Sequence, residues 1–403
     1  MLRDTLRRNK GITLIALVVT IIVLLILAGI SIAMLTGQNG ILNKATEAKE
    51  KTEAAQKVEE KTLQGYEDMM AQYTGNLPSR EETKPYFPNS TFSYKEGDLS
   101  TGLVIKDSND NEYVWVEVPT TIYSDSKYNT KGVPSSGDDW EKIRDCLKVY
   151  TADYSSSFYK DTNTDGTTYS DDYKNMLKSV YTNGGFWIGR YEAGLEGDSS
   201  RTSYTAISAS DKAVIKPNMY PYNYVKRDEA QELATRMNYN ECTSNLIFGI
   251  QWDLVLKYIE TKNSSQKSNL LINSTTIGNY YNSAFTLNRG KFAQYNELSD
   301  WKAYNSEEKS TLVTGSKKKE QSSNSNAILL TTGATEATNL QNIYDIAGNV
   351  WEWTLEFYSA SRPCVSRGGS YNISGSSDPA KNHNYSGTSD CDNLVGFRIG
   401  LWK

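Results

Sequence analysis

Histidine and clustered basic residues are what this sequence most clearly lacks. The 403-residue chain has one histidine, His383, which argues against zinc sites built on several imidazoles and against histidine-dependent catalytic triads. Lysine and arginine number 43 against 48 aspartate and glutamate, a net charge of −5, and no basic patch stands out. Because binding to a phosphate backbone needs clustered cations, the sequence predicts no nucleic-acid partner.

Charge is also missing from one long stretch near the N-terminus. Residues 12–36 are uncharged and almost wholly apolar, and Arg3, Arg7, Arg8 and Lys10 precede them. As a helix this run would be about 37 Å long, enough to cross a hydrocarbon core of about 30 Å. The basic flank favours a cytoplasmic N-terminus. The sequence therefore predicts a transmembrane helix at 12–36 in a single-pass protein of the cell membrane, with an extracellular C-terminal domain.

The residues before the apolar run form a short basic leader, 1–11, that ends in Gly11, and the run itself begins at Ile12. A cleavage site in front of the apolar helix resembles the class III signal of type IV pilins, whereas a secretory signal peptide is cut after its apolar core. The resemblance implies prepilin-type cleavage and methylation at Gly11-Ile12, other pilins as partners, and incorporation in a type IV pilus. Ala16 departs from the family, which usually has glutamate there for fibre assembly. A plain signal anchor is the alternative.

Three further parts follow the apolar run. Residues 37–75 carry a thin apolar stripe at helical spacing and predict a stalk helix. Residues 76–100 contain three prolines among polar residues and predict a linker. Residues 101–403 are long enough for one large domain or two small ones.

Patterns within the large domain predict an α+β architecture. Strands are expected at 102–105, 113–118 and 186–192, the first two as a hairpin around residues 108–111, and helices at 227–237 and 250–260. Polar stretches with few aliphatic residues predict long surface loops at about 121–182, 195–218 and 261–340. Four cysteines in an exported chain allow two disulfides in three pairings, of which Cys364–Cys391 with Cys146–Cys242 is preferred.

The most specific motifs lie near the C-terminus. Residues 342–354 read NIYDIAGNVWEWT, 366–371 read SRGGSY, and 396–400 read GFRIG. In this order they resemble the formylglycine-generating-enzyme (sulfatase-modifying factor) family, over most of 101–403. The resemblance implies a C-type-lectin-like fold with long loops, following the transmembrane and stalk helix. It also implies a scaffold role for Trp351, Trp353, Arg367, Gly368, Gly369, Gly396, Phe397 and Arg398.

The family's oxidase chemistry requires two cysteines, two and seven residues after the aromatic residue that here is Tyr371. Ile373 and Asp378 occupy these positions. Neither can bind Cu(I) as a thiolate, so we expect no copper and no enzyme activity. An extracellular modifying oxidase that uses Cys364 and Cys391 is the alternative.

The same resemblance raises calcium as a possible cofactor. In the family, a loop around the Gly-Asn-x-Trp-Glu-Trp motif binds calcium through the oxygen ligands that this ion requires. The matching positions are Asp345 and Glu352, which keep acidic side chains, and Gly348 and Val350, which would contribute their backbone carbonyls. The alternative is that Glu352 hydrogen-bonds loop amides without an ion.

Residues 371–392 are dominated by Ser, Asn, Asp, Gly and Tyr, the residue types that binding loops favour. The segment resembles the C-terminal region of the variable proteins of diversity-generating retroelements, in which adenine-directed mutagenesis rewrites surface codons. The resemblance implies an adhesin-type protein that binds an unknown surface ligand, protein or glycan. A solvated loop that binds nothing and a minor structural pilin are the alternatives. The candidate contact residues are Tyr371, Asn372, Ser374, Ser376, Ser377, Asp378, Asn382, His383, Asn384, Tyr385, Ser386, Ser389, Asp390 and Asp392.

Overall fold

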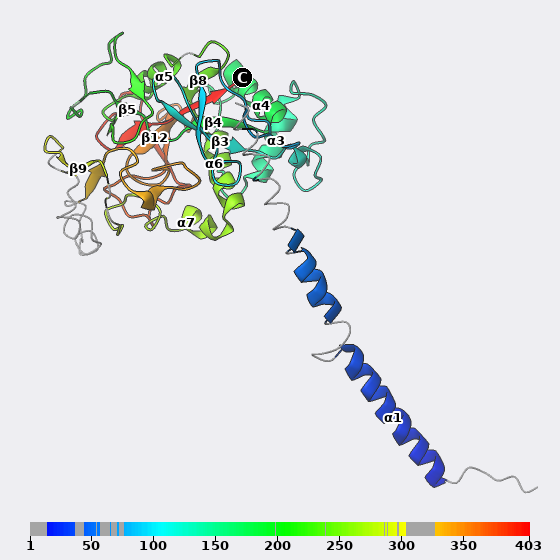
Figure 1. Cartoon of the computed structure of the whole chain (residues 1–403). Coiled ribbons are helices and arrows are strands. Elements are labelled where there is room, and N and C mark those ends of the chain that lie inside the picture. The colour runs from blue at the N-terminus through cyan, green and yellow to red at the C-terminus, as the bar shows by residue number, and fades with distance from the viewer. Residues whose placement is uncertain are drawn as a thin grey trace, which may run out of the picture. The chain divides into compact units, whose positions relative to one another are not determined.

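A computed structural model describes most of the chain (Figure 1). The described residues are 14–36, 44–53, 55–56, 65, 71, 76–197, 199–237, 239–285, 287, 289–295, 298–303 and 327–403. They divide into two compact units, Met1–Met70 and Ala71–Lys403. The leader 1–11, its cleavage site Gly11-Ile12 and most of the stalk 37–75 lie outside the described residues.

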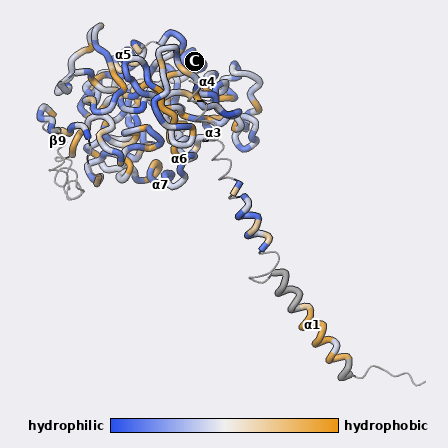
Figure 2. Tube along the Cα trace, viewed as in Figure 1, coloured by the Kyte–Doolittle hydropathy of each residue, from blue (hydrophilic) through white to orange (hydrophobic). Residues whose placement is uncertain are grey.

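The first unit contains helix α1 (Leu14–Thr36), and residues 44–53 are also helical. The side chains described in α1, residues 17–28, are apolar except Thr20 (Figure 2). No helix in the described part of the chain is both long and apolar enough to span a membrane. The predicted transmembrane helix at 12–36 and the single-pass membrane localisation are therefore wrong.

The second unit is built on a six-stranded antiparallel sheet in the order β1-β2-β3-β4-β16-β8. Its strands are β1 (Ser93–Glu96), β2 (Val104–Lys106), β3 (Glu112–Glu117), β4 (Gly185–Gly189), β8 (Thr243–Leu246) and β16 (Ile399–Trp402). The predicted hairpin at β2 and β3 is confirmed. Its turn forms because the Asp107 carboxylate accepts the N–H groups of Asn109 and Asn111, both at 2.8 Å.

Alternate residues of the central strands enter two different cores, as the two-residue period of a strand requires. In β3, Val114 and Val116 pack with helices on one face, whereas Tyr113 and Trp115 pack on the other. The first face is covered by α3 (Trp140–Tyr150), α4 (Asp171–Asn183) and α6 (Gly249–Lys262), with α7 (Lys267–Leu271) following α6. The second is covered by α5 (Arg227–Thr235) and by the C-terminal motifs.

The helices at α5 and α6 match their predictions, but α3 and α4 occupy a region expected to be surface loops. Helix α4 begins where the Ser170 hydroxyl accepts the Tyr173 N–H at 3.1 Å, and it ends at Gly184 with φ 67°. Its apolar side chains, among them Met176 and Leu177, are fully buried. Short 3₁₀ turns lie at η1 (Thr120–Tyr123), η2 (Ser264–Gln266) and η4 (Glu336–Thr338).

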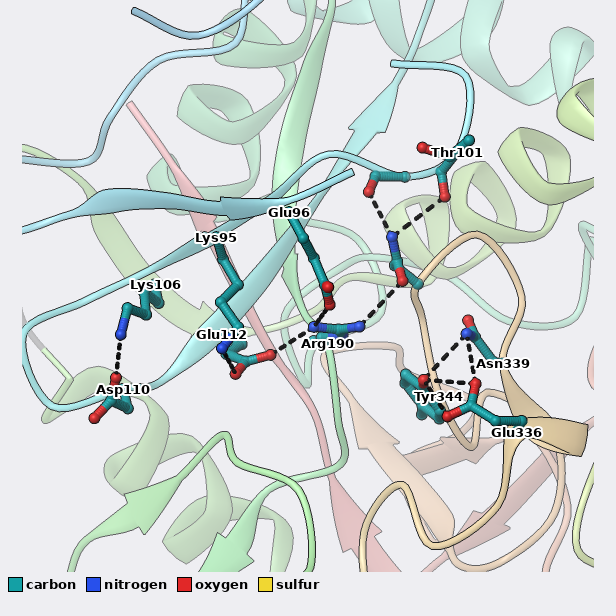
Figure 3. Close-up of polar contacts among 12 residues, drawn as sticks. Lys95, Glu96, Thr101, Lys106, Asp110, Glu112, Arg190, Glu336, Asn339 and Tyr344 are labelled. Atoms are coloured by element: carbon teal, nitrogen blue, oxygen red, sulfur yellow. Dashed lines mark hydrogen bonds and ion pairs between the residues drawn. The ribbon is translucent and has the colours of Figure 1, made fainter. Parts of the chain in front are cut away.

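Residues 76–100 are part of the folded body rather than a linker. They contribute β1, and Phe92 and Leu99 are buried. The buried Arg190 ties this segment to the rest, contacting Glu96 at 2.5 Å and Glu112 at 2.7 Å (Figure 3). Its other terminal nitrogen donates to the Asn342 side chain at 3.0 Å, which joins β1 to the C-terminal motifs.

Smaller sheets complete the body. A four-stranded sheet has the order β14-β13-β12-β15, with β14 at one edge. Its strands are β12 (Trp351–Thr354), β13 (Cys364–Arg367), β14 (His383–Ser386) and β15 (Val395–Phe397). Two three-stranded sheets comprise β10-β9-β11 and β6-β5-β7. Their strands are β5 (Gly194–Leu195), β6 (Ala213–Val214), β7 (Tyr220–Pro221), β9 (Lys291–Gln294), β10 (Lys302–Ala303) and β11 (Ile328–Leu330).

All eight residues expected to form the scaffold are buried. The Trp353 indole donates to the Val225 carbonyl at 2.9 Å, which fastens β12 to the start of α5. Gly369 has φ 83°, and a side chain there would bring its Cβ to 2.5 Å from the Asp378 carbonyl, so this position requires glycine. All four cysteines are free thiols, so neither Cys364–Cys391 nor Cys146–Cys242 forms a disulfide.

Candidate ligand-binding surface

Strand β14, in the middle of the segment expected to bind a ligand, is half-buried except at the exposed Tyr385. It pairs with β13 on one side only, and Tyr385 lies opposite Val365. The Asn384 side chain accepts the Tyr385 N–H at 2.9 Å, so a side-chain amide occupies a backbone donor of this edge strand. Tyr385 is 37% exposed.

Two rings of β14 contact two rings from other segments of the chain. We call these four side chains, His383, Tyr159, Tyr358 and Tyr385, the aromatic ridge. His383 stacks on Tyr159 with ring centroids 4.0 Å apart and planes 9° apart. Tyr159 lies 5.3 Å from Tyr358, which stacks on Tyr385 at 4.4 Å. The guanidinium of Arg362 then lies 5.3 Å from the centre of the Tyr385 ring. Contacts among aromatic rings and cations of this kind fix side chains in place at little further entropy cost.

A backbone bridge brings the ridge segments together. The Lys160 N–H donates to the Phe357 carbonyl at 3.0 Å, and the Phe357 N–H donates to the Lys160 carbonyl at 2.7 Å. Their neighbours Tyr159 and Tyr358 are therefore adjacent, although about 200 residues separate them in the sequence.

A buried charge cluster lies beneath the ridge. Glu356 contacts the His383 Nε2 at 3.1 Å and the Arg367 guanidinium at 3.3 Å, and Arg367 also donates to Asp253 at 2.8 Å. Burial would raise the pKa of Glu356, but Arg367 and His383 reverse this and lower it to about 2. The ring of His383 is thus held by its hydrogen bond with the ionised Glu356 carboxylate and by its stacking on Tyr159.

Asp161 completes the cluster. Its carboxylate accepts the N–H groups of Gly249 at 2.6 Å and Ile250 at 3.1 Å, at the start of α6. Burial, together with the nearby negative charge of Glu356, raises the pKa of Asp161 to about 7 despite these hydrogen bonds. Asp161 therefore carries its proton over most of the acidic range, whereas Glu356 does not.

The structure separates the predicted contact residues into different roles. Tyr371 is fully buried and its hydroxyl accepts from Asn393 at 2.7 Å, so it is not an exposed contact position. Ser374 is 8% exposed, and its hydroxyl accepts the Ser377 N–H at 3.1 Å. The remaining residues that are exposed are Ser376, Ser377, Tyr385, Ser389, Asp390 and Asp392. Those that are half-buried are Asn372, Asp378, Asn382, His383, Asn384 and Ser386.

Residues 371–392 do not form a single cluster. Their first part packs on residues 274–282, where the Ser274 N–H donates to Gly375 and the Gly375 N–H donates to the Asn282 side chain. The middle part, 383–386, is β14 and contributes to the ridge. In the last part, the Asp392 carbonyl accepts the Tyr224 N–H at 2.8 Å, near α5.

Sequence reasoning missed the ridge residues outside 371–392. Phe158 is 74% exposed, and Tyr159, Tyr358 and Arg362 take part in the stack. The available signal was the pair Phe158-Tyr159 within a serine-rich stretch.

The carboxylates expected to bind calcium are already paired. Arg398 Nε contacts both oxygens of Glu352, at 3.1 and 2.9 Å, and Nη2 donates to one of them at 2.6 Å. Asp345 accepts the Gly333 N–H and the Thr338 hydroxyl, both at 2.7 Å. Among the described residues no group of three or more His, Cys, Asp or Glu could hold a metal. Both carboxylates of this loop therefore already have partners, and Glu352 bonds a guanidinium rather than the loop amides of the alternative.

The positions of the family's reactive cysteines have other roles here. The Ile373 carbonyl accepts the Tyr281 N–H at 3.1 Å, and the Asp378 carboxylate accepts from Asn382 at 3.0 Å. Burial raises the pKa of both Cys364 and Cys391. Burial therefore favours the protonated form of both thiols.

Comparison with known proteins confirms the family resemblance over part of the chain. Residues 273–400 match the sulfatase-modifying factor enzyme 1-like domain family. No curated protein matches the chain. Among solved structures, Treponema denticola variable protein 1 is similar with 11% sequence identity and a TM-score of 0.30, over 54% of this chain and 85% of that one. The mixture of helices and sheets expected for the body is present, and the pilin-like leader stays a prediction.

Proposed function

We propose that the body of this protein is a non-catalytic ligand-binding domain, and that the ligand docks on the aromatic ridge and β14. The observation that carries the proposal is the ridge itself. Tyr385, from the segment with a binding-loop composition, stacks on Tyr358 and faces Arg362, and these residue types dominate binding hot spots.

The absence of catalysis is part of the proposal. Ile373 and Asp378 supply no thiolate at the two positions that the family's oxidation requires. Burial raises the pKa of the thiols of Cys364 and Cys391, the other candidates, which disfavours a reactive thiolate. The alternative of a modifying oxidase predicts copper binding by the purified protein that is lost on Cys364→Ser or Cys391→Ser.

The finer proposal is an adhesin whose contact residues are diversified by a retroelement. It rests on the composition of residues 371–392 and on the exposure of Ser376, Tyr385 and Ser389. Sequencing these codons across a population of the source organism tests it. Substitutions confined to adenines would support it, and an invariant segment would leave a fixed binding surface.

Glycan arrays and arrays of cell-surface proteins, probed with the full-length protein, test the binding function. Tyr385→Ala should abolish the signals that the wild type gives. Tyr204→Ala is the matched control, because Tyr204 is 39% exposed and lies outside the ridge. Signals that both variants retain in full would exclude the ridge as the binding surface.

A further inference from the structure

We infer that the ridge docks an acidic face of a protein partner, with Phe158 and Arg362 as anchors that lie outside residues 371–392. The inference rests on the proposed binding function and extends it to the chemistry of the partner. It also assigns a fixed part of the surface to two segments that the sequence motifs did not mark.

Phe158 is the first observation. At 74% it is more exposed than any other large apolar side chain that the structure describes. A single exposed apolar residue needs no explanation by itself. Phe158, however, directly precedes Tyr159 of the ridge in the sequence, so the chain carries an exposed apolar ring one residue from the stack. An interface of this composition buries the ring in a pocket of the partner.

The order of the stack favours a protein over a glycan. The contacts run His383–Tyr159–Tyr358–Tyr385–Arg362, so each tyrosine ring lies between two neighbours. Sugars bind aromatic residues mainly by lying on a free ring face, and here His383 covers a face of Tyr159, Tyr358 covers a face of Tyr385, and Arg362 lies over Tyr385. What it offers is ring edges and hydroxyl groups, which suit the amides and carboxylates of a protein surface.

The charge beside the ridge decides which protein surface fits. Arg362 and Lys160 are both exposed, and neither makes an ion pair with the described residues. The Arg362 guanidinium is oriented by its contact with Tyr385, so its donors are positioned before a partner arrives. In a chain with a net charge of −5, the exposed Arg362 guanidinium, held against a ridge ring without a carboxylate partner, complements an acidic face.

Selection of binders from a phage-displayed library of random peptides tests the inference on the full-length protein. The enriched peptides should carry an excess of Asp and Glu, and they should bind less tightly as salt rises. Phe158→Ala and Arg362→Glu should each weaken binding of the synthetic peptides by about tenfold or more. Ile272→Ala and Lys212→Glu are matched exposed controls and should leave binding unchanged.

The outcomes separate this inference from the proposed function. Peptides that lose affinity on Tyr385→Ala but not on Phe158→Ala or Arg362→Glu would overturn the inference and leave the binding function standing. Peptides insensitive to all three substitutions, or no enrichment at all, would count against both. Basic peptides at the ridge, or a glycan whose binding needs Phe158 and Arg362, would show that the partner class is wrong. Unchanged melting temperatures of both variants would show that the loss is not one of folding.

Discussion

Replacing Asp161 by asparagine should change how the stability of the protein depends on pH. Asp161 is buried and its pKa rises from 3.8 to about 7 on folding, because burial and the charge of Glu356 both disfavour its ionised form. The folded protein therefore holds a proton that the unfolded chain has lost between about pH 4 and pH 7. The free energy of unfolding consequently falls as pH rises through this window.

The size of the effect follows from the shift in pKa. At 1.36 kcal/mol per pKa unit, complete ionisation of Asp161 costs up to roughly 4 kcal/mol by pH 8. Asparagine cannot ionise, so Asp161→Asn should remove most of this slope. It also loses one of the two hydrogen bonds to Gly249 and Ile250, which lowers stability by about 1 kcal/mol at every pH.

Urea unfolding of both proteins at several values between pH 5 and pH 8 measures the slope. Glu356 does not affect this comparison, because its lowered pKa reduces the free energy of unfolding only below about pH 4.5. Asp165→Asn is the control in the same loop, since Asp165 is exposed. Parallel pH profiles for the wild type and Asp161→Asn would refute the assignment of a proton to Asp161 in the folded state.

Three other predictions concern the scaffold. Arg398→Met should lower the free energy of unfolding in urea by about 3–5 kcal/mol, because it leaves the buried Glu352 carboxylate unpaired. The exposed control Lys302→Met should lower it by about 0.5 kcal/mol or less, and an equally small loss for Arg398→Met would contradict the ion pair. Added calcium should leave the melting temperature unchanged, since Arg398 occupies both oxygens of Glu352. A calcium-dependent rise in a thermal scan would contradict that geometry. A thiol reagent should modify Cys391 first in the native protein, and it should titrate four thiols after denaturation. A total of two thiols or of none would show that disulfides form.

Periodicity and turn chemistry were sufficient to predict several elements. The β2–β3 hairpin was readable because Asp107 and the asparagines around it form a local turn, and α5 and α6 because their apolar residues recur at helical spacing. Helices α3 and α4 were missed because polar residues outnumber their few aliphatic ones. Ser170, which caps the start of α4, and Gly184, at which it ends, are the sequence features that mark this helix.

The candidate surface was only half predictable. Tyr385 and His383 belong to a segment whose composition marks it, so the sequence pointed to them. Tyr159 and Tyr358 reach the same place only through the pairing of Lys160 with Phe357, a contact between distant segments that no local pattern encodes. Tyr371 was misassigned because composition does not tell a buried tyrosine from an exposed one. Composition was also misleading for the apolar run at 12–36, because no helix in the part of the chain that the structure describes meets the requirements for a membrane span.

The central claim is that the ridge and β14 form a ligand-binding surface. Its most direct test uses one binder recovered from the arrays or the peptide selection. The dissociation constant of that binder is measured for Tyr385→Ala and for Tyr204→Ala, and the first is divided by the second. The account predicts a ratio of about ten or more, because Tyr385 lies within the stack and Tyr204 lies outside it. A ratio near one, with both variants folded, would contradict the claim.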